Sequence, residues 1–132
     1  MSYLSHAVSS TGNRKIFTIS AWIKCDINET NKTIFGAGTA GTNSGKFYFA
    51  ISSGVIRIGG GANVYLVTTR LLRDPSSWYH VVCAVDTTQS TAANRIKFYI
   101  NGQQITSNYS TSTYPSQDQN TPVNESGKQN TF

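Results

Sequence analysis

Residues 78–86 read WYHVVCAVD, which is the longest apolar run in the chain. A short run rich in valine and aromatic residues, entered from a Pro-containing turn at 73–77, is typical of a buried strand rather than of a helix. We therefore predict a central strand over these residues. Trp78 stands where the turn meets the strand, and we expect it to anchor the core.

Residues 17–24 read FTISAWIK and alternate large apolar side chains with small or polar ones. The period of two predicts a half-buried strand whose inward face is formed by Phe17, Ile19, Ala21 and Ile23. Trp22 falls on the opposite face. We expect a loop to cover it, and the alternative is an exposed aromatic platform on the outside of a sheet.

Residues 95–100 read RIKFYI and alternate in the same way, and Asn101-Gly102 follows them. This dipeptide predicts a type I′ hairpin turn, because both central residues of such a turn need positive φ. No segment shows the apolar spacing of an amphipathic helix over a useful length. About seven or eight short strands at this spacing predict an all-β protein, either a sandwich or a barrel.

Residues 107–132 differ in composition, because Ser, Thr, Asn and Gln make up 16 of these 26 residues. The large apolar residues among them are Tyr109, Tyr114, Val123 and Phe132. We predict a β-sandwich over residues 1–106 and a polar loop or loosely packed arm over residues 107–132. This arm lacks the apolar final strand that would close the sandwich.

The chain has 132 residues, enough for one domain with one core, and a formal net charge of +5. Its eleven Lys and Arg residues are scattered and never form a run. We therefore expect a mildly basic, solvated surface and no nucleic-acid partner; the alternative is an anionic partner, such as an acidic polysaccharide. No stretch approaches the ~18 apolar residues of a membrane span, and the start lacks the pattern of a signal peptide.

Two cysteines, Cys25 and Cys83, lie in apolar runs where a small hydrophobic residue would serve equally well. We expect two buried free thiols. A disulfide between them would need neighbouring strands with Cα atoms within about 7 Å, and the sequence leaves that question open. Two cysteines without a His cluster do not make a zinc site, so we assign no metal ligands.

Three segments in this order, FTISAWIK, WYHVV with Asp86 after it, and KFYING, resemble the laminin G-like signature of the concanavalin A-like lectin/glucanase superfamily. They lie within about residues 3–106. The resemblance implies an antiparallel β-sandwich of the concanavalin A-like jelly-roll type. Family members usually continue into further strands that nothing here matches, so the sandwich is expected to lack its last strands or to receive one from a neighbouring chain.

Residues 73–80, 86–89 and 114–117 look more narrowly like versions of this domain in virion proteins of marine bacteriophages. This likeness implies a non-catalytic module on the virion surface, in a tail or a capsid decoration, that binds carbohydrate or a host-surface polysaccharide. One alternative is a purely structural virion subunit that contacts neighbouring subunits, homo-oligomers included. Another is a secreted, extracellular adhesion domain, and the fold alone does not choose among these functions.

Glycosidases of this superfamily need paired carboxylates about 5–10 Å apart, and the six acidic residues of the chain are not paired along any strand. His6 and His80 have no Ser or Cys with an orienting acid beside them in the sequence. We therefore expect no catalytic residues, no enzymatic activity and no cofactor. Asp86 is expected to be a turn acceptor, and the alternative is a calcium ligand, as in some laminin G-like domains.

Sugar binding would use exposed aromatic side chains that stack on pyranose faces, with amides and arginines at the rim. Four residues in or near loop-like segments fit this description: Tyr65, Arg70, Tyr109 and Tyr114. For each of them, ordinary packing or a surface position is the competing interpretation. These four are the ligand-binding residues that the sequence proposes.

Overall fold

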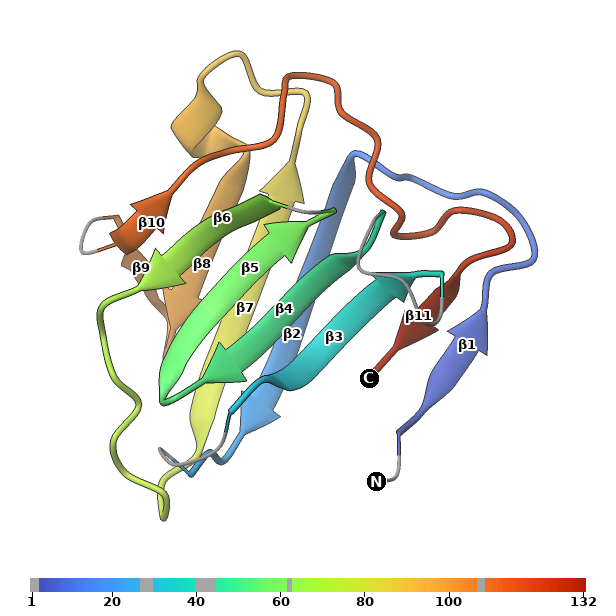
Figure 1. Cartoon of the computed structure of the whole chain (residues 1–132). Coiled ribbons are helices and arrows are strands. Elements are labelled where there is room, and N and C mark those ends of the chain that lie inside the picture. Colours follow the sequence, from blue (N-terminus) through green and yellow to red (C-terminus); the bar gives the residue numbers. More distant parts are fainter. Residues whose placement is uncertain (1–2, 27–29, 40–44, 62, 107–108) are drawn as a thin grey trace.

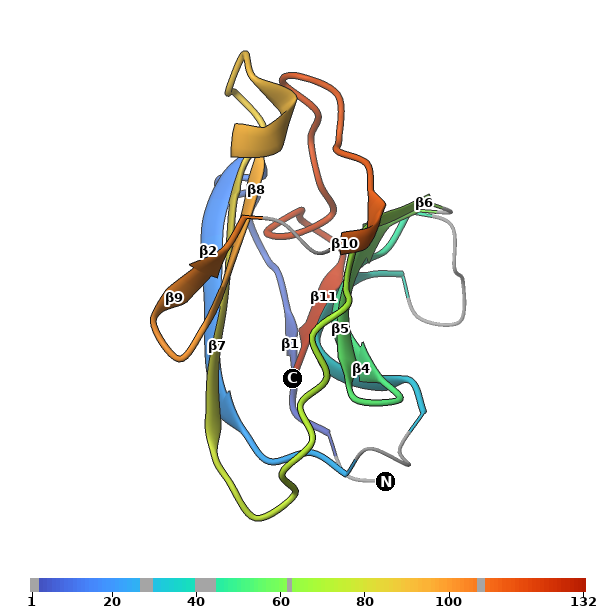
Figure 2. The ribbon, with the colours of Figure 1, turned by 90° about the vertical axis from the view of Figure 1, so that its left-hand side faces the viewer.

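The computed structural model describes residues 3–26, 30–39, 45–61, 63–106 and 109–132. In these ranges the chain forms eleven strands and one short 3-10 turn. The strands form two antiparallel sheets that face each other across the core (Figure 1, Figure 2). The prediction of an all-β antiparallel sandwich is confirmed.

The larger sheet has seven strands in the order β1-β11-β3-β4-β5-β6-β10. These strands are β1 (Ser5–Ala7), β3 (Lys32–Gly38), β4 (Phe47–Ser52), β5 (Val55–Gly60), β6 (Asn63–Thr68), β10 (Tyr109–Ser112) and β11 (Gln129–Thr131). Strands β3 to β6 follow one another as a meander. β11 and β1 extend the sheet on one side of this meander, and β10 extends it on the other.

The smaller sheet has four strands in the order β2-β7-β8-β9. They are β2 (Ile16–Ile23), β7 (Tyr79–Asp86), β8 (Ile96–Ile100) and β9 (Gln103–Ile105), with the 3-10 turn Ala92–Asn94 before β8. β7 pairs with β2 along eight residues and with β8 along five. The apolar run that predicted a central strand therefore lies inside its sheet.

The core lies between the two sheets, where the inward side chains of alternate strand positions meet. Phe49 of β4 and Phe98 of β8 come from opposite sheets, are fully buried, and have ring centroids 5.8 Å apart at 73°. Phe17 of β2 and Phe47 of β4 pack edge to face at 5.3 Å. Edge-to-face contacts are preferred because the positive edge of one ring meets the negative face of the other.

Both cysteines are buried and free, as their apolar surroundings predicted. Cys83 lies in β7, and burial raises the pKa of its thiol to about 12. Burial and the neighbouring carboxylate of Asp26 raise the pKa of the Cys25 thiol. The thiolate is the reactive form of cysteine, and burial disfavours it at both positions.

The turn between β8 and β9 falls at Asn101 and Gly102, with φ of 50° and 78°. Both values are positive, as a type I′ turn requires, so the hairpin predicted from this dipeptide is confirmed. Ser53 and Gly54 make the same kind of turn between β4 and β5, with φ of 51° and 75°.

The segment after β9 belongs to the sandwich. β10 pairs with β6, and β11 lies between β1 and β3. Val123, in the loop between β10 and β11, is buried in the core. The expectation of a loosely packed arm is therefore corrected for residues 109–132; residues 107 and 108 lie outside the described ranges.

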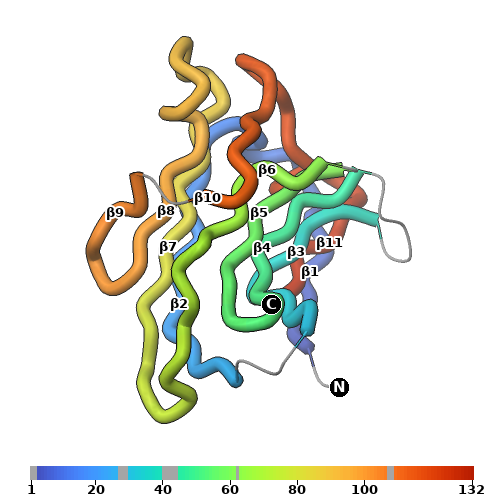
Figure 3. The backbone as a smooth tube through the Cα atoms, turned by 60° about the vertical axis from the view of Figure 1, so that its left-hand side comes forward, coloured from blue at the N-terminus to red at the C-terminus, as the bar shows by residue number. Residues whose placement is uncertain are grey.

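Polar contacts hold this segment against the residues that precede β2. Thr121 Oγ1 donates to the carbonyl oxygen of Arg14 at 2.7 Å, and Arg14 Nε donates to the carbonyl oxygen of Thr121 at 2.7 Å. The Arg14 guanidinium also pairs with Glu125 at 2.9 Å. The two segments run side by side at one end of the sandwich (Figure 1, Figure 3). Contacts of this kind are made by main-chain and polar groups. They therefore cannot be predicted from the spacing of apolar residues in the sequence.

Candidate functional site

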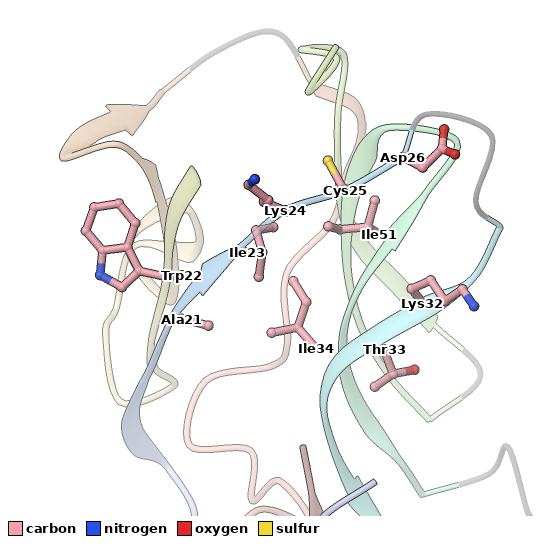
Figure 4. A pocket seen from close by; sticks show the side chains of 10 residues that line it. All are labelled: Ala21, Trp22, Ile23, Lys24, Cys25, Asp26, Lys32, Thr33, Ile34 and Ile51. Carbon is pink, nitrogen blue, oxygen red and sulfur yellow. The ribbon is translucent and has the colours of Figure 1, made fainter. Parts of the chain in front are cut away.

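Two tryptophans lie exposed on the outer face of the four-stranded sheet. Trp22 of β2 is 65% exposed, and Trp78, directly before β7, is 59% exposed. No described element covers this face of the sheet (Figure 2). Trp22 points away from the space between the sheets (Figure 4).

These positions correct two expectations. The loop expected over Trp22 is absent from the described chain, and the alternative of an exposed aromatic side chain is confirmed. Trp78 is not a core anchor. Alternation along β2 fixes which face Trp22 occupies, but nothing in a strand's own sequence states whether that face is covered.

The main-chain pattern explains which side chains meet on this face. Asp86 N–H donates to the carbonyl oxygen of Arg95 at 2.9 Å, and Asn101 N–H donates to that of His80 at 2.7 Å. Even-numbered residues of β7 thus turn their main-chain groups toward β8, and odd-numbered residues turn theirs toward β2. Trp22 stands opposite His80 in the register, so the two form a non-hydrogen-bonded pair, the kind in which side chains lie closest.

Trp22 and His80 stack on each other within this pair. Their ring centroids are 4.9 Å apart and their planes differ by 27°. The hydroxyl oxygen of Ser20 lies 2.8 Å from His80 Nε2. The imidazole is thus held by an indole and a hydroxyl, while most of the indole surface stays open to solvent.

Lys24 and Tyr99 extend the same face. Lys24 Nζ lies 5.6 Å from the centroid of the Trp78 ring, within range of a cation–π interaction. Tyr99 of β8 stands opposite Val82 and Gln104, between the buried Phe98 and Ile100, and so points outward. We refer to the following residues as the aromatic face: Trp22, Lys24, Trp78, His80 and Tyr99.

A pocket of about 510 Å³ opens on the inner side of the same end of β2. Ile23, Ile34 and Ile51 give it an apolar lining, as seen in Figure 4. Trp22 and Lys24 contribute to both the pocket and the aromatic face. The end of β2 therefore separates an apolar recess from an open aromatic surface.

The four residues proposed from the sequence lie elsewhere. Tyr65 is only 6% exposed, and its hydroxyl accepts a hydrogen bond from Gln119 Nε2 at 3.1 Å. The half-buried Tyr109 donates from its hydroxyl to the carbonyl oxygen of Ile105 at 2.6 Å, and burial raises its pKa to about 12.

The pairing of β10 with β6 brings the three tyrosines to one edge of the larger sheet. Tyr114 follows β10 and packs against the core, whereas Arg70 is exposed beyond the end of β6. Ligand binding by Tyr65, Arg70, Tyr109 and Tyr114 stays a prediction. The sequence signal for the aromatic face is the outward position of Trp22.

Asp86 organises the turn after β7. One of its carboxylate oxygens accepts from Thr88 N–H at 3.1 Å and from Thr88 Oγ1 at 2.6 Å, and the other accepts from Gln89 Nε2 at 2.7 Å. These bonds hold the pKa of Asp86 below its usual value. This is the geometry of a turn acceptor, and calcium binding at Asp86 stays a prediction.

The described residues contain no group of three or more His, Cys, Asp or Glu side chains that could hold a metal ion. They also contain no helix long and apolar enough to cross a membrane. Ser20 and His80 lie on an open sheet face rather than in a pocket that could enclose a reacting group. The absence of catalytic residues stays a prediction.

The sequence pattern of the family described as the concanavalin A-like lectin/glucanases superfamily matches residues 2–131. Among solved structures, domains LG4-5 of the mouse laminin alpha1 chain are similar, with a TM-score of 0.62 and 15% sequence identity. That similarity covers 98% of this chain and 31% of the laminin chain. No curated protein matches the sequence. Because the family pattern extends over nearly the whole sequence, the chain belongs to the concanavalin A-like lectin/glucanase superfamily.

Proposed function

We propose that the chain is a non-catalytic module that binds carbohydrate on the aromatic face. The observation that carries the proposal is the exposure of Trp22 and Trp78 on one uncovered sheet face. Large aromatic side chains are seldom left this exposed, and a patch of them marks a surface that binds something. Membership of a lectin-type superfamily makes carbohydrate the leading candidate.

The chemistry of the aromatic face suits sugars. An indole offers a flat apolar surface on which the C–H face of a pyranose can stack. Ser20, His80 and Tyr99 add groups that exchange hydrogen bonds with sugar hydroxyls. The face is open rather than enclosed, which favours several units of a polysaccharide over one small sugar in a closed cavity.

The proposed setting is the surface of a phage virion, where the module would bind a host-surface polysaccharide. Support for this setting comes from the likeness of residues 73–80, 86–89 and 114–117 to phage virion proteins. A secreted adhesion domain would use the same face. A structural subunit is the second candidate, favoured by the outer edge of β2 beside the aromatic face, which pairs with no other strand of the described ranges.

The test is binding of the purified chain to an array of bacterial surface polysaccharides. We expect Trp22→Ala and Trp78→Ala each to weaken binding by about tenfold or more, because central aromatic residues dominate such interfaces. Neither change should lower the unfolding temperature by more than a few degrees, since neither side chain is in the core. Binding should also change the tryptophan fluorescence.

Tyr3→Ala is the matched control. Tyr3 is an aromatic residue that is 70% exposed, but it lines a groove on the larger sheet with Tyr48 and Gln129. Its removal should leave polysaccharide binding unchanged. If no polysaccharide binds the chain, or if the double variant lacking both tryptophans binds as well as the wild type, the proposal is wrong.

A further inference from the structure

Asn101 and Gly102 form the only Asn-Gly pair in the sequence. In an unfolded peptide this pair is chemically unstable, because the main-chain nitrogen of the glycine can attack the side-chain amide and glycine has no side chain to obstruct it. Both residues are exposed at the turn between β8 and β9, and a Cβ at Gly102 would meet no atom within 4 Å. Neither burial nor side-chain bulk therefore protects Asn101 from this reaction.

The reaction converts the side-chain amide of Asn101 into an acid. The nitrogen of Gly102 gives its proton to water or hydroxide and forms a bond to Asn101 Cγ. The bond from Cγ to Nδ2 breaks, and the leaving nitrogen takes up a proton and departs as ammonia. Water then opens the succinimide ring at either of its carbonyl carbons, which leaves aspartate or isoaspartate at position 101. One water is consumed and one ammonia is released, with no oxidation or reduction.

The folded turn holds the two reacting atoms apart. The φ values of Asn101 and Gly102, 50° and 78°, are those of a type I′ turn. In such a turn the first central residue has ψ of about +30°. This torsion places Gly102 N close to the main-chain nitrogen of Asn101 and nearly opposite its Cβ. Because the ring closes only when Gly102 N and Cβ lie on the same side of the Cα–C bond, the closed turn does not react.

Two hydrogen bonds with His80 hold Asn101 in this unreactive position. His80 N–H donates to Asn101 Oδ1 at 2.9 Å, and Asn101 N–H donates to the carbonyl oxygen of His80 at 2.7 Å. The ladder between β7 and β8 is thus continued by one further pair. Rotation about the Cα–C bond of Asn101 changes the direction in which the chain leaves it. The pairing of β9 with β8 must therefore break before the ring can close.

β9 is a strand that can open without unfolding of the sandwich. It has three residues, Gln103–Ile105, and lies at the edge of the smaller sheet, where β8 is its only partner among the described strands (Figure 2). Gln103 and Gln104 are exposed, and Ile105 is half-buried. Short elements with few buried contacts open locally at a lower free energy than the whole chain.

We propose that Asn101 is a deamidation site that reacts only when the β8–β9 hairpin opens. The modification therefore accumulates with the age of the molecule. Isoaspartate adds one carbon to the main chain, so the two-residue turn cannot re-form and His80 loses its partner at the turn. Because His80 stacks on Trp22, the aromatic face changes with it. The reaction itself does not depend on carbohydrate binding by that face.

The test follows deamidation of the purified chain in mildly alkaline buffer by mass spectrometry of its peptides, with an isoaspartyl methyltransferase to detect isoaspartate. Asn101 should react at least about tenfold more slowly in the folded chain than in guanidinium, because only the open fraction reacts. Asn13 is the internal control. It is exposed and its Oδ1 accepts a main-chain N–H at 3.0 Å, but Arg14 follows it. It should stay intact over the same interval.

Two variants test the role of the hairpin. Ile105→Ala removes side-chain packing that holds β9 against the core, so it should speed deamidation of the folded chain several-fold and leave the rate in guanidinium unchanged. Gln104→Ala is the matched control on the same strand, since Gln104 is exposed, and should leave both rates unchanged. If Ile105→Ala does not fold, urea below the unfolding transition should speed the reaction of the wild type instead.

Three results would overturn the proposal. The first is a rate in the folded chain that equals the rate in guanidinium. The second is a rate at Asn13 that equals the rate at Asn101. The third is a rate at Asn101 that neither Ile105→Ala nor low concentrations of urea increase, because the reaction would then take place in the closed turn.

Discussion

At the scale of single residues, Asp74 shows how one carboxylate can order a turn. Its oxygens accept hydrogen bonds from Ser76 N–H at 2.9 Å, from Ser76 Oγ at 2.6 Å, and from the hydroxyl of Ser77. These donors lower the pKa of Asp74 from 3.8 to about 2. The turn leads directly into Trp78 and β7, so Asp74 helps to set where the aromatic face begins.

Asp74→Asn should therefore destabilise the fold in a pH-dependent way. A carboxylate whose folded pKa is depressed contributes stability above its unfolded pKa, and the contribution is lost as pH falls through the folded value. The stability gap between wild type and Asp74→Asn should be full at pH 7 and should close between about pH 4 and pH 2. Urea unfolding of both proteins at pH 7 and at pH 2 measures it; a gap of equal size at both values would contradict this role.

Trp22 and His80 show which parts of the aromatic face can be predicted from single residues. The period of two places Trp22 on the outward face, and the structure agrees with that placement. For His80 the sequence predicts only its strand. Its contacts with Trp22 and Ser20 depend on the register of β2 against β7, which the sequence does not state. The outward position of Trp22 therefore predicts where the aromatic face lies. The other residues of that face can be identified only once the pairing of the strands is known.

At the scale of elements, the β8–β9 hairpin depends on two residues in the left-handed region. Gly102 has φ of 78°, and the space around its Cα is open, because a Cβ at this position would meet no atom within 4 Å. A methyl group at this position would strain the backbone, because φ is positive, but it would not clash with any neighbouring atom. The requirement for glycine at this turn thus comes from its backbone conformation rather than from side-chain packing.

Gly102→Ala should destabilise the chain by about 1–2 kcal/mol, the usual cost of the left-handed conformation for a residue with a Cβ. Gly36→Ala is the matched control, because a Cβ there lies 3.5 Å from Thr33 Cγ2, an ordinary contact, and the φ of Gly36 is not strained. Chemical denaturation of the two variants measures the difference. Equal stabilities would show that the turn tolerates the strain.

The elements also divide into those that the sequence reveals and those that it does not. β2, β7 and β8 are apolar at alternate positions, so their burial pattern is visible in the sequence. β1 reads SHA and β11 reads QNT, and both contribute mainly main-chain pairing to one side of the larger sheet. Such strands have no side-chain periodicity to detect, which is why the composition of the last 26 residues predicts an arm instead.

At the scale of the whole molecule, the C-terminal segment is part of the folding unit. It supplies β10, β11, the buried Val123, and the contacts of Thr121 with Arg14. Without it β3 and β6 lose the strands that pair with their edges, and the core loses the buried side chain of Val123.

Removal of residues 107–132 should therefore leave a chain that is unfolded or aggregated. Removal of residues 1–7 is the matched control, because it takes away only β1, whose residues are all exposed, and should leave a folded, less stable protein. Circular dichroism and light scattering of both truncated chains give the comparison. A folded, monomeric protein after loss of residues 107–132 would mean that the first 106 residues form a complete domain.

The pairing of β1 with β11 sets a requirement on biosynthesis. Ser5 leaves the ribosome well before its partner Thr131, because the two residues lie near opposite ends of the described chain. At ordinary rates of translation this interval is on the order of ten seconds. Throughout it, the edge of β3 lacks the strand β11 that pairs with it in the finished fold, so the larger sheet is incomplete. The larger sheet can be completed only after β11 has been synthesised. Until then, nascent chains of this protein should depend on molecular chaperones to prevent aggregation.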